Sequence, residues 1–96
     1  MEILGGTIIS INQQAVSNAG TLTIGTKDGN ISITTPDLRG ATYGVTNTNT
    51  FKFYDGVIKG ITGSISGNIN EIETGSTRVD TSEVISGNTY HKTYLN

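Results

Sequence analysis

Two stretches of this chain repeat each other, and this repeat restricts the possible folds more than any other feature. "AVSNAGTLTIG" at residues 15–25 aligns with "GVTNTNTFKFY" at residues 44–54. Self-similarity at a period of about 20–50 residues indicates an architecture of stacked repeats. Five matched pairs are each 29 positions apart, namely Val16 and Val45, Asn18 and Asn47, Thr21 and Thr50, Leu22 and Phe51, and Ile24 and Phe53.

Three short blocks indicate repeated corners between strands. "GGTI" at residues 5–8, "DGNI" at 28–31 and "DGVI" at 55–58 each contain glycine and end in isoleucine, and their starts are 23 and 27 residues apart. Asp-Gly is a favoured turn pair because glycine adopts positive φ and aspartate accepts local backbone hydrogen bonds. A calcium site would require more oxygen ligands, about 6–8. We therefore predict corners at Gly6, Asp28, Gly29, Asp55 and Gly56.

The segments between these corners read as β-strands. Sixteen Thr and thirteen Ile dominate the chain, and residues branched at Cβ suit a pleated strand better than a helix. Apolar and polar residues alternate with a period of two, as in residues 21–24, 31–34 and 50–53. This alternation places Lys27, Lys52 and Lys59 toward solvent. No window has apolar residues at helical spacing, so we predict an all-β protein.

A unit of 23–27 residues with short strands and variable corners predicts a parallel β-solenoid (β-helix) of about three coils over residues 1–73. Successive coils would stack about 4.8 Å apart, so that equivalent residues form ladders. "TTPDLRGATYG" at residues 34–44 is expected to bulge outward, because proline cannot donate to a ladder. Expected ladders place Leu22 over Phe51, Ile24 over Phe53, and Ile8 over Ile31 over Ile58.

Residues 74–96 lack the repeat unit and are expected to close the C-terminal end of the same domain. "EVI-SGN-TYH" predicts two strands joined by a turn that contains glycine, and residues 76–81 predict a further strand. A β-hairpin would cover the open end of the solenoid and its unpaired strand edges. No equivalent cap is visible at the N-terminal end, which we expect to be open.

The stretch "NTNTFKFYDGVIKG", followed by "ISGNINEIE" and a late "TYHKTYL", resembles repeat units of long, adhesin-like bacterial surface proteins. Those units carry the pattern N-x-G-T-F-x-F-Y-D-G-x-I-x-G. Asn49 stands where the pattern has glycine, while the earlier copy keeps that glycine as Gly20. The resemblance covers roughly residues 5–73 and implies an extracellular stalk or adhesive repeat without catalytic residues. Matching residues are Asn47, Thr50, Phe51, Phe53, Tyr54, Asp55, Gly56, Ile58 and Gly60.

Charge and composition exclude several classes of function. Six Lys and Arg residues and a formal net charge of −2 cannot form the basic face that nucleic-acid binding requires. No apolar run approaches the roughly 18 residues of a membrane helix, so we expect no membrane insertion. The chain has no cysteine, which excludes a disulfide, a thiol nucleophile and a Cys-based metal site.

Candidate catalytic residues are few. Glu71 and Glu73 alternate along a predicted strand, and two carboxylates about 5–9 Å apart can hydrolyse a glycosidic bond. Nothing in the sequence builds a cleft around them, so we interpret them as solvated surface charge. His91 is the only histidine, which makes a metal site a poor interpretation. We expect no enzyme activity, metal or cofactor.

The sequence therefore predicts a structural or adhesive spacer that displays variable corners, located outside the cell or on its surface. "MEILGGTIIS" lacks the features of a signal peptide, so we expect that signal to lie outside this chain. One alternative is a fibre subunit that stacks end to end, with other copies or neighbouring repeats as partners. A second alternative is a β-helix that binds or cleaves glycans. Surface contact residues for such a ligand would be Tyr54, Tyr43, Tyr90 and Tyr94.

Overall fold

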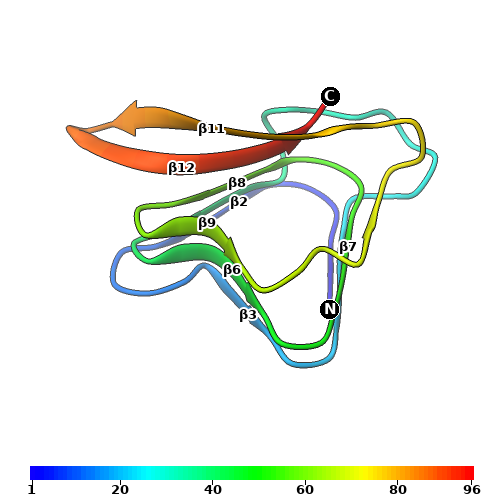
Figure 1. The fold of residues 1–96 in the computed structure, drawn as a ribbon, viewed down its shortest axis with the longest axis horizontal. Coiled ribbons are helices and arrows are strands. Elements are labelled where there is room, and N and C mark those ends of the chain that lie inside the picture. The colour runs from blue at the N-terminus through cyan, green and yellow to red at the C-terminus, as the bar shows by residue number, and fades with distance from the viewer.

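The computed structural model describes residues 1–96 and contains twelve β-strands and no helix (Figure 1). The protein is therefore all-β, as the composition predicts. The strands are β1 (Glu2–Ile3), β2 (Thr7–Ser10), β3 (Val16–Asn18), β4 (Thr21–Ile24), β5 (Asp37–Gly40), β6 (Tyr43–Asn47), β7 (Thr50–Phe53), β8 (Val57–Gly60), β9 (Gly63–Ser66), β10 (Glu71–Ile72), β11 (Arg78–Ile85) and β12 (Asn88–Leu95).

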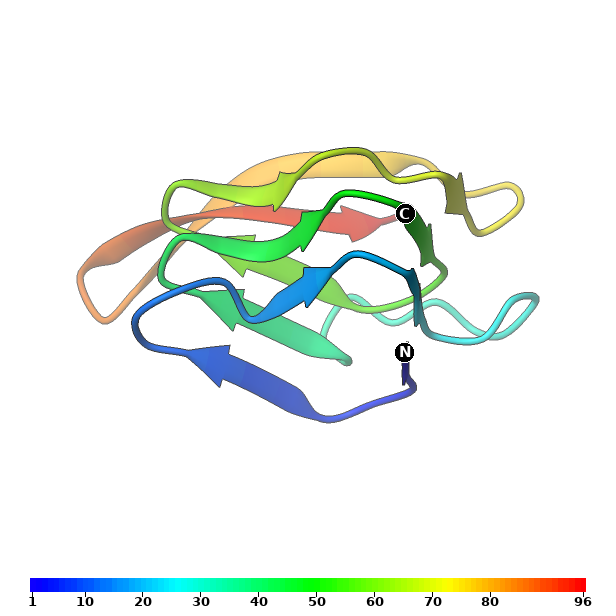
Figure 2. The same cartoon turned by 90° about the horizontal axis from the view of Figure 1, so that it is seen from below.

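These strands form three open sheets that the chain visits in a fixed order. Sheet A has the order β1-β4-β7-β10, sheet B has β11-β12-β8-β5-β2, and sheet C has β3-β6-β9. The first nine strands pass through sheets A, B and C three times, and each passage is called a circuit. Strands of successive circuits pair in parallel. Viewed along the stack the sheets form a triangular outline (Figure 1), and the circuits lie one above another in Figure 2.

Sheet A supplies the largest buried side chains. Leu22 lies opposite Phe51 and Ile24 lies opposite Phe53 in the β4–β7 register, and all four side chains are fully buried. These are the pairs that the 29-residue repeat places together. The ladder continues on both sides, because Ile3 is opposite Ile24 and Ile72 is opposite Phe53. A one-residue slip would turn every one of these side chains to solvent, so apolar burial fixes the register.

Sheet B has a different core ladder from the predicted one. Ile8 is opposite Leu38, and Leu38 is opposite Ile58; Leu38 and Ile58 are buried, and Ile8 packs half-buried against them. The prediction of Ile31 in this ladder is wrong, because Ile31 lies outside any strand and is 37% exposed. The segment that contains Leu38 has only one large apolar residue, so its sequence carries no strand-like alternation.

The corner predicted at Asp28 and Gly29 is also wrong, because the corner that precedes β5 lies at Pro36. Gly6 and Gly56, which directly precede β2 and β8, have φ of 82° and 95°, and the strand registers place Pro36 at the equivalent position before β5. Asp28 and Gly29 instead form a turn inside residues 25–36, the long loop between β4 and β5. This loop is an insertion within the second circuit. The predicted bulge at 34–44 is wrong, since β5 and the start of β6 lie there.

Glycine is required where the chain turns from sheet B to sheet C. Gly40 and Gly60 are neighbours in the β5–β8 register, and each is followed by a two-residue connection to the next strand. A Cβ atom on Gly40 would lie 1.8 Å from the carbonyl oxygen of Tyr43. Ser10 takes the same place in the first circuit, where the connection is five residues long and leaves room for a side chain.

Asn18 and Asn47 form a buried amide ladder at the corner between sheets C and A. The Asn18 Nδ2 donates to Asn47 Oδ1 at 2.8 Å and to the Thr50 carbonyl at 2.8 Å. Asn47 Nδ2 in turn donates to the Asn68 carbonyl at 2.9 Å. This hydrogen bond along the stack joins the two asparagines that the 29-residue repeat aligns. These bonds matter because a buried amide without partners would be strongly destabilising.

The C-terminal hairpin extends sheet B. β11 and β12 pair antiparallel through residues 78–85 and 88–95, and β12 pairs antiparallel with β8. Residues 76–81 are not a separate strand, since most of them belong to β11. Thr93 is fully buried, its hydroxyl donates to Asp80 Oδ1 at 2.6 Å, and it hydrogen bonds with the Ser64 hydroxyl of β9. The hairpin is therefore attached to sheets B and C at the end of the stack.

We predict that Leu38→Ala lowers the free energy of unfolding by about 2–5 kcal/mol, because it leaves a cavity in the core. Ile31→Ala removes a similar side chain from the exposed loop and should change it by less than about 0.5 kcal/mol. Urea denaturation of the two variants and the unaltered chain measures both effects. Equal losses would contradict the assignment of Leu38 to the core ladder.

Candidate functional site

Charged and aromatic side chains gather on the outer face of sheet B. In β12, Thr93 and Leu95 point inward and are fully buried, so the alternate residues Tyr90, Lys92 and Tyr94 point outward. The register places Lys92 opposite Lys59 and Tyr94 opposite Val57 of β8. We call the outward side chains Asp37, Arg39, Lys59, Glu83, Tyr90, Lys92 and Tyr94 the sheet B face.

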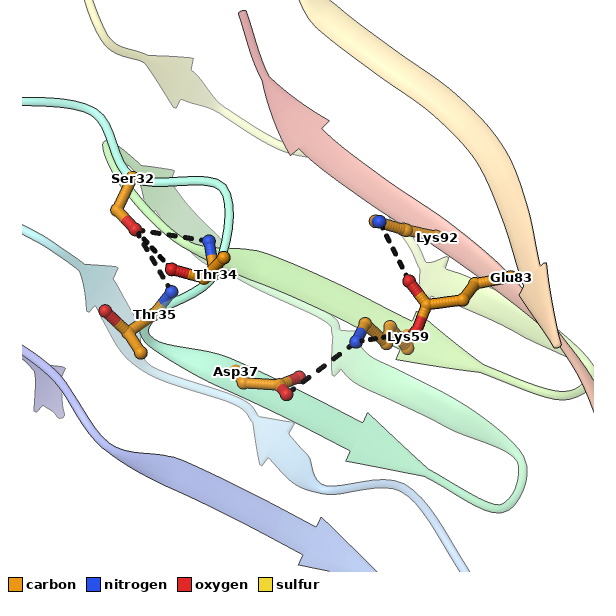
Figure 3. Close-up of polar contacts among 7 residues, drawn as sticks. All are labelled: Ser32, Thr34, Thr35, Asp37, Lys59, Glu83 and Lys92. Carbon is orange, nitrogen blue, oxygen red and sulfur yellow. Dashed lines mark hydrogen bonds and ion pairs between the residues drawn. The ribbon is translucent and has the colours of Figure 1, made fainter. Parts of the chain in front are cut away.

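Lys59 lies at the centre of this face and carries its main ion pairs (Figure 3). Its Nζ is 3.7 Å from Asp37 Oδ2 and 3.3 Å from Glu83 Oε2, and Lys92 Nζ is 2.9 Å from Glu83 Oε1. Alternation places Lys59 on the outer side, but the expectation of solvent exposure is wrong, because the residue is only 8% exposed. Buried ammonium groups need such partners, since desolvation disfavours the charged form.

Glu83 links the two lysines across three strands. Its hydrogen bond from Lys92 lowers the pKa of the Glu83 carboxyl, Lys59 adds to this effect, and partial burial opposes it. The carboxylate thereby joins the hairpin strand β11 to both β12 and β8. Asp37 Oδ1, at the other side of Lys59, is buried without a hydrogen-bond partner.

The two outward tyrosines of β12 are each covered by a cation. The Arg39 guanidinium lies 5.9 Å from the centre of the Tyr90 ring, and Lys92 Nζ lies 5.5 Å from the centre of the Tyr94 ring. Such contacts contribute about 0.5–1 kcal/mol at exposed sites. Both tyrosines remain half-exposed, so the face presents aromatic edges, donors and acceptors together.

Tyr54 does not belong to this face. It follows β7 at the corner between sheets A and B, and the prediction of a surface contact there is wrong, because Tyr54 is only 5% exposed. Its hydroxyl donates to the carboxylate of Glu71 on β10, the next strand of sheet A, and Lys27 Nζ lies 3.4 Å from Glu71 Oε2. Repetition could not assign Tyr54 because its partner Glu71 lies outside the repeated unit.

The hydrogen bond between Tyr54 and Glu71 shifts both groups in opposite directions. It raises the pKa of Tyr54 to about 12, with burial and the nearby carboxylates adding to the effect. The same bond lowers the pKa of Glu71, and Lys27 lowers it further while burial opposes the shift. The neutral phenol and the ionised carboxylate therefore stabilise each other over a wide range of pH.

Two acidic side chains anchor the long loop 25–36. Asp55 Oδ1 accepts the backbone N–H groups of Ser32 and Gly56. Glu73 Oε2 accepts the N–H of Asp28 at 2.9 Å. The prediction of a solvated Glu73 is wrong, as it is 5% exposed, and the structure gives both Glu71 and Glu73 specific partners rather than a shared solvent face.

Within the loop, Ser32 Oγ accepts the backbone N–H groups of Thr34 and Thr35 at 3.1 and 3.2 Å (Figure 3). The loop is therefore bonded to the stack at several positions, among them Lys27, Asp28 and Ser32, and also by its own side chain. The exposed residues between the two anchors, at positions 29–31, have no such attachment.

The four tyrosines predicted as contact residues are not brought together. Tyr43 lies on β6 in sheet C beside Gly63, Tyr54 is buried at a corner, and only Tyr90 and Tyr94 share a face. The sequence pattern identified Tyr90 and Tyr94 but missed Lys59 and Glu83. Their only signal is that "TSEVI" and "TYHKTYL" would form opposite strands of one hairpin, which places Glu83 near Lys92.

No group of three or more His, Cys, Asp or Glu side chains is arranged to hold a metal ion, and the surface has no pocket. No helix could cross a membrane. Comparison with protein-family models, with curated proteins and with solved structures found no match.

We predict that Tyr54→Phe raises the pKa of Glu71 toward that of an ordinary glutamate, because the carboxylate loses its hydroxyl donor. An NMR titration of the glutamate carboxyl carbons measures the shift. In the unaltered chain, the contribution of the Tyr54 hydroxyl to stability should be present below pH 10 and lost as the pH rises through about 12. Tyr43→Phe, on another sheet, is the control, and an equal effect on Glu71 would contradict this assignment.

We also predict that Glu83→Gln lowers stability at neutral pH, because Lys59 and Lys92 lose their shared carboxylate. The folded-state pKa of Glu83 is lowered, so its contribution is present above the unfolded-state pKa and disappears as the pH falls through the folded-state value. Urea denaturation across this acidic range should show the two proteins converging in stability. Glu2→Gln, at an exposed glutamate outside these ion pairs, is the matched control, and an equal loss of stability at neutral pH would contradict this assignment.

Proposed function

We propose that this chain is a parallel β-solenoid segment that acts as a stiff spacer and display module of an adhesin-like bacterial surface protein, without catalysis. The observation that carries this proposal is the in-register stacking of three circuits over one ladder of buried side chains. Parallel registers join β4 to β7, β5 to β8 and β6 to β9. A stack in which each layer contacts mainly its neighbours resembles repeat architectures.

The variation between circuits supports the display part of the proposal. The connection from sheet A to sheet B has three residues after β1 and after β7, but twelve after β4. This added length projects outward as the loop 25–36, whose residues are mostly exposed, while the strands on either side keep their register. An apolar interior in constant register, with exposed corners of variable length, suits a module that presents surface.

The resemblance to adhesin-like repeats supports the proposed class and a location outside the cell or on its surface. The residues that carry this resemblance are mostly structural: Phe51 and Phe53 are core side chains, and Asp55 and Gly56 form a corner. The resemblance therefore concerns the scaffold. The resemblance therefore supports a spacer role, in which the folded scaffold and not a binding residue performs the function.

An insertion experiment tests the separation of scaffold and display loop. The position after Asn30 lies between the two loop anchors. Inserting Gly-Ser-Gly-Ser there should lower the free energy of unfolding by less than about 1 kcal/mol. The same insertion between Thr48 and Asn49 interrupts the amide ladder at Asn47 and should cost about 2 kcal/mol or more. Equal losses of unfolding free energy for the two insertions would contradict the proposal. Catalytic cleavage of a polysaccharide by this chain would also contradict it. A crystal structure would test the solenoid architecture itself.

Glycan binding is a second candidate, favoured by the sheet B face. Tyr90 and Tyr94 lie on one side of β12 beside Arg39, Lys59 and Lys92, which combines aromatic edges with hydrogen-bond donors. A glycan array should then give a signal that Tyr90→Ala with Tyr94→Ala abolishes, while Tyr43→Ala preserves it. An array with no signal, or one insensitive to the double variant, excludes this candidate and leaves the spacer role.

A further inference from the structure

The N-terminal end of the stack presents three unpaired strand edges in one circuit. β1, β2 and β3 are the terminal strands of sheets A, B and C, and they contribute two, four and three residues. An unpaired edge exposes backbone donors and acceptors that readily pair with another chain. Four of the eight exposed large hydrophobic residues lie in the same circuit, namely Met1, Leu4, Ile9 and Ile11.

This end lacks the charges that usually protect a strand edge from pairing. Residues 1–26 contain a single charged side chain, that of Glu2, and neither lysine nor proline occurs in β1, β2 or β3. The edge strands β10 and β11 at the opposite end carry Glu71, Arg78, Asp80 and Glu83. Charged side chains are therefore present on two of the three edge strands at the C-terminal end, with β9 uncharged, whereas at the N-terminal end only β1 carries one, Glu2.

The C-terminal end also has the wrong shape to receive an N-terminal end. Beyond the third circuit, sheet A has one further strand, sheet B has two and sheet C has none. Neighbouring strands lie about 4.8 Å apart, so the three edges end at different heights (Figure 2). The strands β1, β2 and β3 form a single circuit and cannot meet all three of these edges at once. Head-to-tail stacking into a fibre is thus opposed by shape as well as by charge.

We propose that two copies of this chain pair through their N-terminal ends to form a closed, two-fold symmetric dimer. A two-fold axis perpendicular to the stack and passing midway between the two β2 strands makes them antiparallel neighbours. It also places β1 of each copy beside β3 of the other. Such an interface uses the same surface on both copies, so the assembly is limited to two copies. The nearly uncharged end produces little repulsion between them.

The hydrogen-bonding pattern of β2 selects one register. The Asp37 N–H donates to the Gly6 carbonyl at 2.9 Å, and alternate residues of a parallel ladder bond to the same neighbour. Thr7 and Ile9 therefore turn their N–H and C=O groups to the open side. In an antiparallel pair these groups must face each other, which allows Thr7 with Thr7, Ile9 with Ile9, or Thr7 with Ile9 across the two copies. Only the last register pairs both outward residues of each β2 strand, so we place Thr7 opposite Ile9 of the second copy. Ile8 then lies opposite Ile8 of the second copy, and the ladder Ile58–Leu38–Ile8 continues across the interface.

Asn18 provides an independent sign that this end accepts a neighbour. Asn47 Oδ1 accepts two donors, the Asn18 Nδ2 and the Asn49 N–H. Asn18 Oδ1 accepts only the Gly20 N–H at 3.2 Å, although Asn18 is 6% exposed. Because the two amides are stacked, the free lone pair of Asn18 points to the N-terminal end. A backbone N–H group from β1 of the second copy would donate the second hydrogen bond to Asn18 Oδ1.

Sedimentation equilibrium from micromolar to millimolar concentration tests the dimer. We expect a reversible monomer–dimer equilibrium with no larger species. Ile9→Glu should weaken it severalfold, because the carboxylates of the two copies would be diagonal neighbours on one face of the joined sheet, where like charges repel; within one chain this carboxylate would lie beside Arg39. Val84→Glu places the same charge on the opposite edge strand, β11, and should leave the equilibrium unchanged.

Cysteine cross-linking tests the register, since the chain has no cysteine of its own. A residue on the two-fold axis in a non-hydrogen-bonded pair has a Cα–Cα distance of about 4.5 Å, which permits a disulfide. Oxidised Ile8→Cys should form a covalent dimer, whereas Val84→Cys should remain largely monomeric. This result stands even where Ile9→Glu fails to fold. A monomer at every concentration, growth beyond the dimer, or equal cross-linking of the two variants would each overturn the proposal.

Discussion

The parallel pairing of β4 with β7 is the contact on which the rest of the structure depends. It joins the two repeated segments over four residue pairs and buries the two phenylalanines against Leu22 and Ile24. Backbone bonds set the spacing of the circuits, and the aromatic side chains require one register. Sheets B and C inherit this register because each circuit leaves sheet A at an equivalent position.

Polar contacts then attach the irregular parts to this stack. The amide ladder of Asn18 and Asn47 fixes the corner that enters sheet A, while Asp55 and Glu73 hold the long loop by its backbone N–H groups. Lys59 and Glu83 attach the hairpin to sheet B. Each of these groups is buried or partly buried and has a partner in another circuit, so the polar contacts reinforce the same stacking that the apolar ladder defines.

The parts that sequence could predict are those that repeat. The all-β character, the pairs Leu22 with Phe51 and Ile24 with Phe53, and the Asn18–Asn47 bond all follow from one 29-residue spacing. Ile31 was misplaced because "DGNI" imitates a corner, whereas the true strand around Leu38 has one apolar side chain and two polar neighbours. Tyr54, Glu73 and Lys59 were misjudged because their burial depends on contacts between circuits, which no local pattern encodes.

The two ends of the stack differ in a way that repetition alone does not explain. A chain of identical circuits would have equivalent ends, each able to stack on the other. Here the hairpin adds two strands to sheet B, with charged residues on the outermost one, and this makes further growth at the C-terminal end unfavourable. The first circuit keeps the uncharged edges of an interior layer. Its exposed apolar residues and the Asn18 Oδ1 that accepts one hydrogen bond therefore distinguish the N-terminal end from the C-terminal end.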